Sequence, residues 1–141
     1  MPIKNYTTTI APIKTIGEIS KILHEHGARK ILQEYGDNGE IKSVSFSVDT
    51  PQGEAYFRLP ANVDGVLIRL QEDQTPKRDR DQAERTAWRI LYAWIVAQMA
   101  IIEANMAAVE EVFLPYMITA GNQTVYEAFK TEQLKLMGDA Q

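Results

Sequence analysis

Apolar and polar residues alternate along three short stretches in the first half of the chain, as they do in half-buried β-strands. The clearest stretch is 41–49, which is flanked by 29–35 and 54–59 across two turn sequences, Asp-Asn-Gly and Thr-Pro-Gln-Gly. Connections this short join antiparallel neighbours, so we predict a three-strand meander. Threonine-rich residues 7–10 predict a fourth, short strand. The middle stretch has an apolar side, Val44, Phe46 and Val48, and a polar side, Ser43, Ser45 and Ser47.

Elsewhere the apolar residues recur every three or four positions, which predicts amphipathic helices over 16–26, 63–71 and 125–137. Thr15 and Glu18 have the spacing of a capping box at the start of the first helix. Asn62 is placed to cap the second helix.

A longer helix is expected to begin at Asp79 or Asp81 and to end near Ala107. Between 87 and 102 nearly every residue is apolar, and a helix that is apolar all round has to be buried all round. One small sheet cannot cover both sides, so either the short helices or a second subunit must do so. We favour a homo-oligomer. Its interface is predicted to centre on Trp88, Leu91, Trp94, Ile95 and Ile102.

These elements predict an α+β fold in which a small antiparallel sheet of three or four strands packs with helices. The long C-terminal helix would form the core of the oligomer. The chain has 141 residues, of which 45% are hydrophobic, which suits one domain. We expect a sheet part over 1–60 and a helical part over 61–141.

The residues that serve nucleophilic and metal chemistry are scarce. There is no cysteine, and His24 and His26 are two positions apart on a helix, so they point in different directions. No glycine-rich phosphate loop is present, and the serine row is typical of a solvent-exposed strand face. An enzyme would use Glu103, at the end of the apolar run, or the acidic pairs Glu72–Asp73, Asp79/Asp81 and Glu110–Glu111. We expect no catalytic residue, metal or cofactor, and a protein that is not an enzyme.

The N-terminus lacks the apolar core of a signal peptide, and the apolar run 88–102 is too short and too polar to span a membrane. We therefore expect a cytoplasmic protein that does not bind membranes. The net charge of −4 argues against strong non-specific binding to nucleic acid.

Basic residues nevertheless gather at the start of the long helix, where Arg85 and Arg89 are four positions apart and share a face. Arg58 and Tyr56, on the third strand, and Asn62, in the loop after it, would join them if the helix packs beneath that edge of the sheet. Arginines beside an aromatic ring can hold a phosphate and a stacked base. The alternative is a surface network of ion pairs. The predicted ligand-binding residues are Tyr56, Arg58, Asn62, Arg85 and Arg89.

Four segments resemble a family of small, largely uncharacterised proteins encoded by phages and prophages. They read PIKNYTT at 2–8, FRLPANVD at 57–64, AERTAWR at 83–89 and EVFLPYM at 111–117. No catalytic motif accompanies the resemblance. It implies a viral or mobile-element origin, and by analogy an accessory protein that acts by binding in the cytoplasm of the host.

The favoured function is thus a phage-type accessory binding protein. It would counteract host defence by sequestering an anionic, nucleotide-like ligand or a host protein. The alternative is a single-stranded nucleic-acid-binding protein of phage replication or recombination, which would need the basic strips of several subunits.

Overall fold

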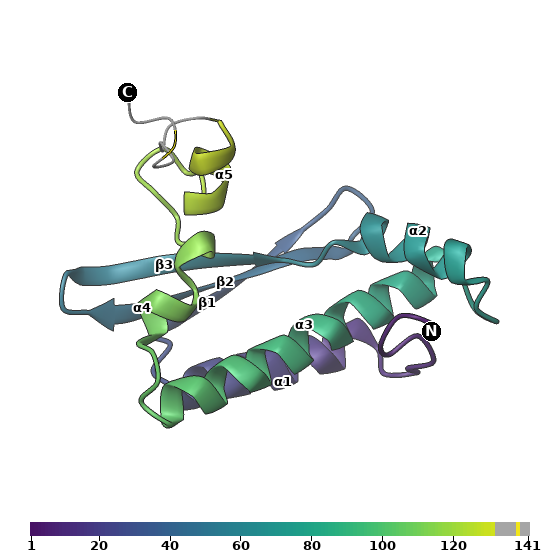
Figure 1. Ribbon diagram of the computed structural model, residues 1–141, viewed down its shortest axis with the longest axis horizontal. Coiled ribbons are helices and arrows are strands. Elements are labelled where there is room, and N and C mark those ends of the chain that lie inside the picture. The colour runs from purple at the N-terminus through teal and green to yellow at the C-terminus, as the bar shows by residue number, and fades with distance from the viewer. Residues whose placement is uncertain (132–137, 139–141) are drawn as a thin grey trace.

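The computed structural model describes residues 1–131 and 138, and its centre is a three-stranded antiparallel sheet (Figure 1). The strands are β1 (Lys30–Tyr35), β2 (Ile41–Thr50) and β3 (Gly53–Pro60), in the order β1-β2-β3. The predicted meander is confirmed. Gly39 and Gly53 have positive φ angles of 81° and 123° in the two hairpin connections, which glycine adopts without steric cost. Each strand therefore pairs with its neighbour in the chain, and β2 lies in the middle.

Two helices cover one face of this sheet, α1 (Pro12–Glu25) and α3 (Arg80–Glu103), and Figure 1 shows both on the same side. The apolar side of β2 faces them, as the alternation predicted. The shared core is closed by Phe113, which follows the short helix α4 (Val109–Val112). The largest buried side chains of this core are Ile16, Ile19, Leu23, Phe46, Phe57, Leu59, Trp88, Ile95 and Phe113.

The remaining elements lie at the two ends of the sheet. Helix α2 (Val63–Asp73) follows β3 and packs on α3, and its cap is the predicted one, since the Gly65 amide donates to Asn62 Oδ1 over 2.9 Å. The 3-10 helix η1 (Leu114–Tyr116) leads to α5 (Val125–Lys130), which stands on the other side of the sheet from α1 and α3 (Figure 1). The predicted last helix, 125–137, is thus seen as far as Lys130, and residues 132–137 lie outside the described residues.

The α+β class is confirmed, but the expected position of the long helix is wrong. Helix α3 is central in the chain and not C-terminal, because α4, η1 and α5 follow it. Its cap is Asp79, whose carboxylate accepts a hydrogen bond from the Gln82 amide over 2.9 Å. The chain itself buries Trp88 and Ile95, and it leaves Leu91, Trp94 and Ile102 partly exposed. The predicted homo-oligomer stays a prediction.

The fourth strand expected over residues 7–10 does not form. This segment lies against α3, where the buried Gln82 side chain donates to the carbonyls of Tyr6 and Thr8, both over 3.0 Å. Tertiary hydrogen bonds therefore replace the sheet that β-propensity favoured. The capping box at Thr15 is also wrong. Helix α1 begins earlier, at Pro12, a residue suited to the first helical position, and Thr15 is buried within it.

The carboxyl end of α1 is joined to that of α3 by a contact that depends on pH. His26 Nε2 lies 2.6 Å from Glu103 Oε1, and Nδ1 lies 2.8 Å from the carbonyl of Ile22. Both ring nitrogens thus face acceptors, which favours the doubly protonated ring. The hydrogen bond with Glu103, and then that with Ile22, raises the pKa of His26 above its ordinary 6.5.

Because folding raises the pKa of His26, its contact with Glu103 stabilises the fold fully below pH 6.5, the pKa of histidine in the unfolded chain. This stabilisation disappears as the pH rises through the pKa of His26 in the folded chain. We compare the wild type with Glu103→Gln, which lacks the carboxylate. Between about pH 6 and pH 9, the wild type should lose more of its free energy of unfolding than the variant does, by an amount below about 1 kcal/mol. Urea titrations at both pH values measure it. Equal pH dependence in both proteins would contradict the proposed pairing.

Candidate binding site

The face of the sheet opposite α1 and α3 carries a trough whose floor is the serine side of β2. The register places Leu32 of β1 and Arg58 of β3 on either side of Ser45. Lys30 and Tyr56 flank Ser47 in the same way, and Glu34 and Pro60 flank Ser43. Small residues on the central strand between larger ones on both edges make a concave surface. We call this surface the serine trough: Ser43, Ser45 and Ser47, with Lys30, Leu32, Glu34, Tyr56, Arg58 and Pro60.

The three serines are buried, with exposed fractions between 0% and 6%, and not solvent-exposed as the sequence suggested. Ser43 Oγ donates to Glu34 over 3.3 Å, and Ser47 Oγ donates to Glu54 over 2.8 Å. Ser45 Oγ, between them, has no hydrogen-bond partner in the described part of the chain. This hydroxyl lines a cavity that opens on the same face of the sheet. A ligand lying in the trough would supply the missing partner.

Arg58 forms the wall beside Ser45 and connects the sheet to the segment before α5. Its Nη2 donates to Asn122 Oδ1 over 2.9 Å and its Nη1 to the Asn122 carbonyl over 3.4 Å. Its Nε lies 3.5 Å from Glu34 Oε1, and Nη1 lies 3.9 Å from Glu127 Oε1. Two carboxylates therefore balance this guanidinium. Because its charge is balanced, Arg58 would contribute to ligand binding mainly as a hydrogen-bond donor of fixed orientation.

The other end of the serine trough is a cluster of charged and phenolic groups. Lys30 Nζ donates to Tyr56 Oη over 2.9 Å and lies 3.3 Å from Glu54. The hydrogen bond with Tyr56, followed by that with Glu54, raises the pKa of Lys30. The hydrogen bond from Ser47, with the charge of Lys30, lowers the pKa of Glu54. Both groups are thus held charged at neutral pH, and Lys30 remains accessible at the mouth of the trough.

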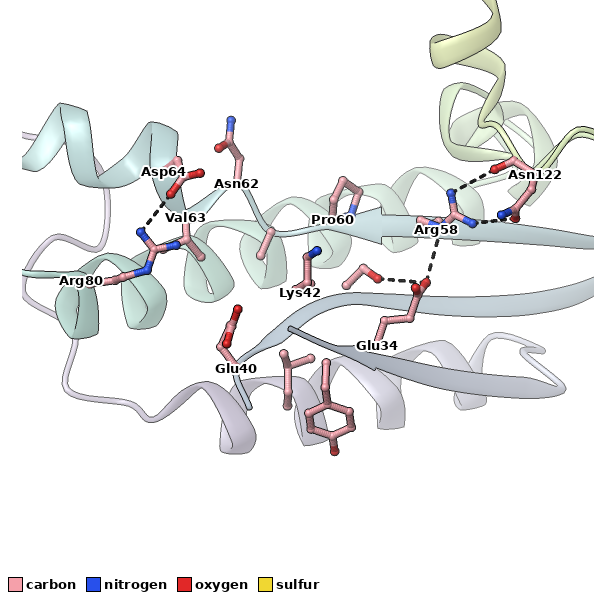
Figure 2. Close-up of a pocket in the computed structure, with 14 residues that line it drawn as sticks. Glu34, Glu40, Lys42, Arg58, Pro60, Asn62, Val63, Asp64, Arg80 and Asn122 are labelled. Atoms are coloured by element: carbon pink, nitrogen blue, oxygen red, sulfur yellow. Dashed lines mark hydrogen bonds and ion pairs between the residues drawn. The ribbon is translucent and has the colours of Figure 1, made fainter. Parts of the chain in front are cut away.

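Two cavities of about 530 Å³ each open on this face, a size suited to a small molecule. The first lies over Ser45, between Leu32, Tyr56 and Ile118, and its exposed lining is largely apolar. The second lies toward α2 and has a mixed lining that includes six charged side chains. Figure 2 shows this lining, with Arg80 turned toward Asp64. Three residues border both cavities: Glu34, Arg58 and Asn122.

The structure brings together three of the five residues predicted to bind a ligand. Tyr56 and Arg58 line the first cavity, and Arg58 and Asn62 line the second. Arg85 and Arg89 line neither one. Arg85 donates to Gln82 over 2.6 Å. Arg89 donates to Glu18 of α1 over 3.1 Å and lies 4.2 Å from the centre of the Tyr92 ring. The face shared by these two arginines turns to α1 and the N-terminal segment, and not to the sheet edge.

Several residues of the site were not singled out from the sequence. The alternation along β2 shows the row of serines. Because β2 is the middle strand of the meander, this row of small residues could have been predicted to lie between larger side chains of β1 and β3 and so to form the bottom of a groove. Ile118 and Asn122 gave no such signal, because they come from a distant loop. That loop is held on β3 by an antiparallel bridge between Phe57 and Met117 and by the Ile118 amide, which donates to the Tyr56 carbonyl over 2.7 Å.

Within residues 1–131 and 138, no group of three or more metal-ligating side chains gathers closely enough to hold an ion. No helix among them has the length and hydropathy needed to cross a membrane. Comparison with protein-family models, with curated proteins and with solved structures returns no match.

Proposed function

We propose that this chain is a non-enzymatic binding protein that holds a small nucleotide-like ligand in the serine trough. The observation that carries the proposal is the buried Ser45 hydroxyl, unpartnered within the described residues, on the floor of a cavity of ligand size. A donor or acceptor atom of a base placed over Ser45 would satisfy it.

A planar heteroaromatic ring suits the first cavity. Leu32 and Ile118 offer apolar walls and Tyr56 offers an aromatic one, while Glu34, Arg58 and Asn122 stand at one end with acceptors and donors for the edge of a base. Cations lie on either side, Lys30 at the mouth and Lys42 and Arg80 in the second cavity. A phosphate would bind at one of them.

The charge of the second cavity favours a small ligand over a polyanion. Its lining has three cations, Lys42, Arg58 and Arg80, and three carboxylates, Glu34, Glu40 and Asp64. A long phosphate backbone gains affinity from a surplus of cations, which this arrangement does not offer. The two cavities share Glu34, Arg58 and Asn122, so an extended ligand could occupy both, and single-stranded nucleic acid is the second candidate.

Binding without turnover is proposed because neither histidine of the chain is close to Ser45. Both histidines of the chain lie at the end of α1, which covers the opposite face of the sheet. In the phage setting that the sequence resemblance implies, holding a nucleotide signal without consuming it would counteract a host defence.

Isothermal titration with adenosine, guanosine, cytidine and uridine monophosphates tests the proposal. We expect saturable binding of at least one of them, and Ser45→Ala to weaken it about tenfold, the effect of one hydrogen bond of about 1.4 kcal/mol. Because Ser45 loses no partner within the protein, the variant should unfold at the wild-type temperature or above it.

Ser20→Ala makes the same change on α1 and should leave binding unaltered. If no monophosphate binds, or if Ser45→Ala binds as tightly as the wild type, the proposal fails. Affinity that instead grows with oligonucleotide length and falls steeply with salt would favour the nucleic-acid alternative.

A further inference from the structure

The two edges of the sheet differ in how they are covered. The outer edge of β3 is paired in part by Met117 and Ile118 through the bridge described above. The outer edge of β1 pairs with no strand among the described residues, and β1 has β2 as its sole extensive neighbour there.

An uncovered edge strand can pair with another chain unless its sequence or shape prevents it. Strand β1 has neither proline nor glycine among its six residues. The register irregularity lies at its end, between Glu34 and Tyr35, so Lys30–Glu34 is regular. Leu32, in the middle of that stretch, is 60% exposed on the open face of the sheet. The edge therefore combines free backbone groups with an exposed apolar side chain.

We infer that β1 pairs antiparallel with β1 of a second copy of this chain, around a two-fold axis that passes beside Leu32. Antiparallel pairing centred on Leu32 sets Leu32 against the partner's Leu32. It also sets Lys30 against the partner's Glu34, and Glu34 against the partner's Lys30. Shifting the centre by one residue would set Leu32 against either the partner's Glu34 or the partner's Lys30. Charge complementarity and the apolar pair thus select one register. In this isologous contact the Lys30–Glu34 pair forms twice, and the Leu32 pair forms once, at the axis.

This pairing would change the proposed site as well as the oligomeric state. Leu32, Lys30 and Glu34 all belong to the serine trough, so the two troughs would lie side by side on one six-stranded sheet. Each would gain the partner's Lys30 next to its own Glu34, which places an extra cation near Arg58. The inference stands on the geometry of β1 and does not require that a nucleotide be the ligand.

A charge exchange tests the pairing with its register. We expect the wild type to sediment at twice 15.9 kDa at micromolar concentration. Lys30→Glu and Glu34→Lys should each sediment as single chains, since each opposes like charges. An equimolar mixture of the two should restore a dimer containing one copy of each, because every pair is then complementary. Lys21→Glu, the same change on the exposed side of α1, should remain dimeric.

A cross-link gives a second measurement, because the chain has no cysteine of its own. Under mild oxidation Leu32→Cys should form a disulfide-linked dimer in high yield, since directly opposed Cβ atoms are close to disulfide distance. Tyr35→Cys, equally exposed, should not. A wild type that is monomeric throughout would overturn the inference. So would a dimer that survives both charge reversals and does not cross-link through Leu32→Cys, which would indicate an interface elsewhere, such as α3.

Discussion

Replacing Phe113 with alanine is expected to lower the free energy of unfolding by about 3–5 kcal/mol. The Phe113 ring is fully buried, and it meets the rings of Phe46, Phe57 and Trp94 edge-on, with centroids 5.3, 6.1 and 5.5 Å away. It therefore joins the sheet, α3 and the C-terminal segment at one point. A phenyl-sized cavity there cannot close without moving all three, since Phe46 also stacks on Phe57 and Trp94 also packs on Tyr116.

Urea denaturation measures this change, and the melting temperature should fall by roughly 10 °C or more. The matched control is Phe129→Ala, which removes the same ring from the partly exposed pair with Tyr126 and should cost less than about 1 kcal/mol. If Phe113→Ala lowered the free energy of unfolding by less than about 1 kcal/mol, the Phe113 ring would not be a major contributor to the stability of the core.

The strands and most helices could be predicted because their determinants are local. Alternation along residues 41–49 and short turns on either side are sufficient to define a meander, and Asn62 and Asp79 are caps whose partners lie three residues away. The segment over 7–10 failed because its structure is determined at a distance. Its carbonyls find the buried Gln82 amide, about 75 residues further along the chain, and no local pattern contains that information.

The residues of the site that could be predicted are those whose positions depend on local sequence. Tyr56, Arg58 and Asn62 follow one another along β3 and into α2, so a correct strand assignment places them together. Placing Arg85 and Arg89 required the orientation of α3, and the structure turns Arg89 to Glu18 of α1. The burial of Ser45 likewise depends on the long side chains of Leu32 and Arg58 on the neighbouring strands, which alternation along β2 does not report.

Arg58→Leu should open the serine trough while leaving the core of the sheet intact. The Arg58 side chain is 24% exposed, and its guanidinium holds Asn122 by two hydrogen bonds, with Glu34 and Glu127 nearby. Removing it leaves these carboxylates without their cation and frees the loop that forms one wall of both cavities. Hydrogen bonds to charged groups are worth about 1.5–3 kcal/mol. We therefore expect amide exchange at Ile118 and Thr119 to accelerate roughly tenfold or more, and nucleotide affinity to fall at least as far.

Arg89→Leu separates this effect from the general loss of an ion pair. Arg89 is also a partly buried arginine that donates to one glutamate, but its partner lies on α1, away from the open face of the sheet. Arg89→Leu should lower the free energy of unfolding about as much as Arg58→Leu does. It should leave the amide exchange rate at Ile118 and the nucleotide affinity unchanged. Arg58→Lys completes the series, because lysine restores the charge without the planar fork that reaches two Asn122 oxygens. If Arg58→Leu and Arg89→Leu had the same amide exchange rate at Ile118 and the same nucleotide affinity, Arg58 would have a structural role only. The ligand would then bind in the trough without contacting Arg58.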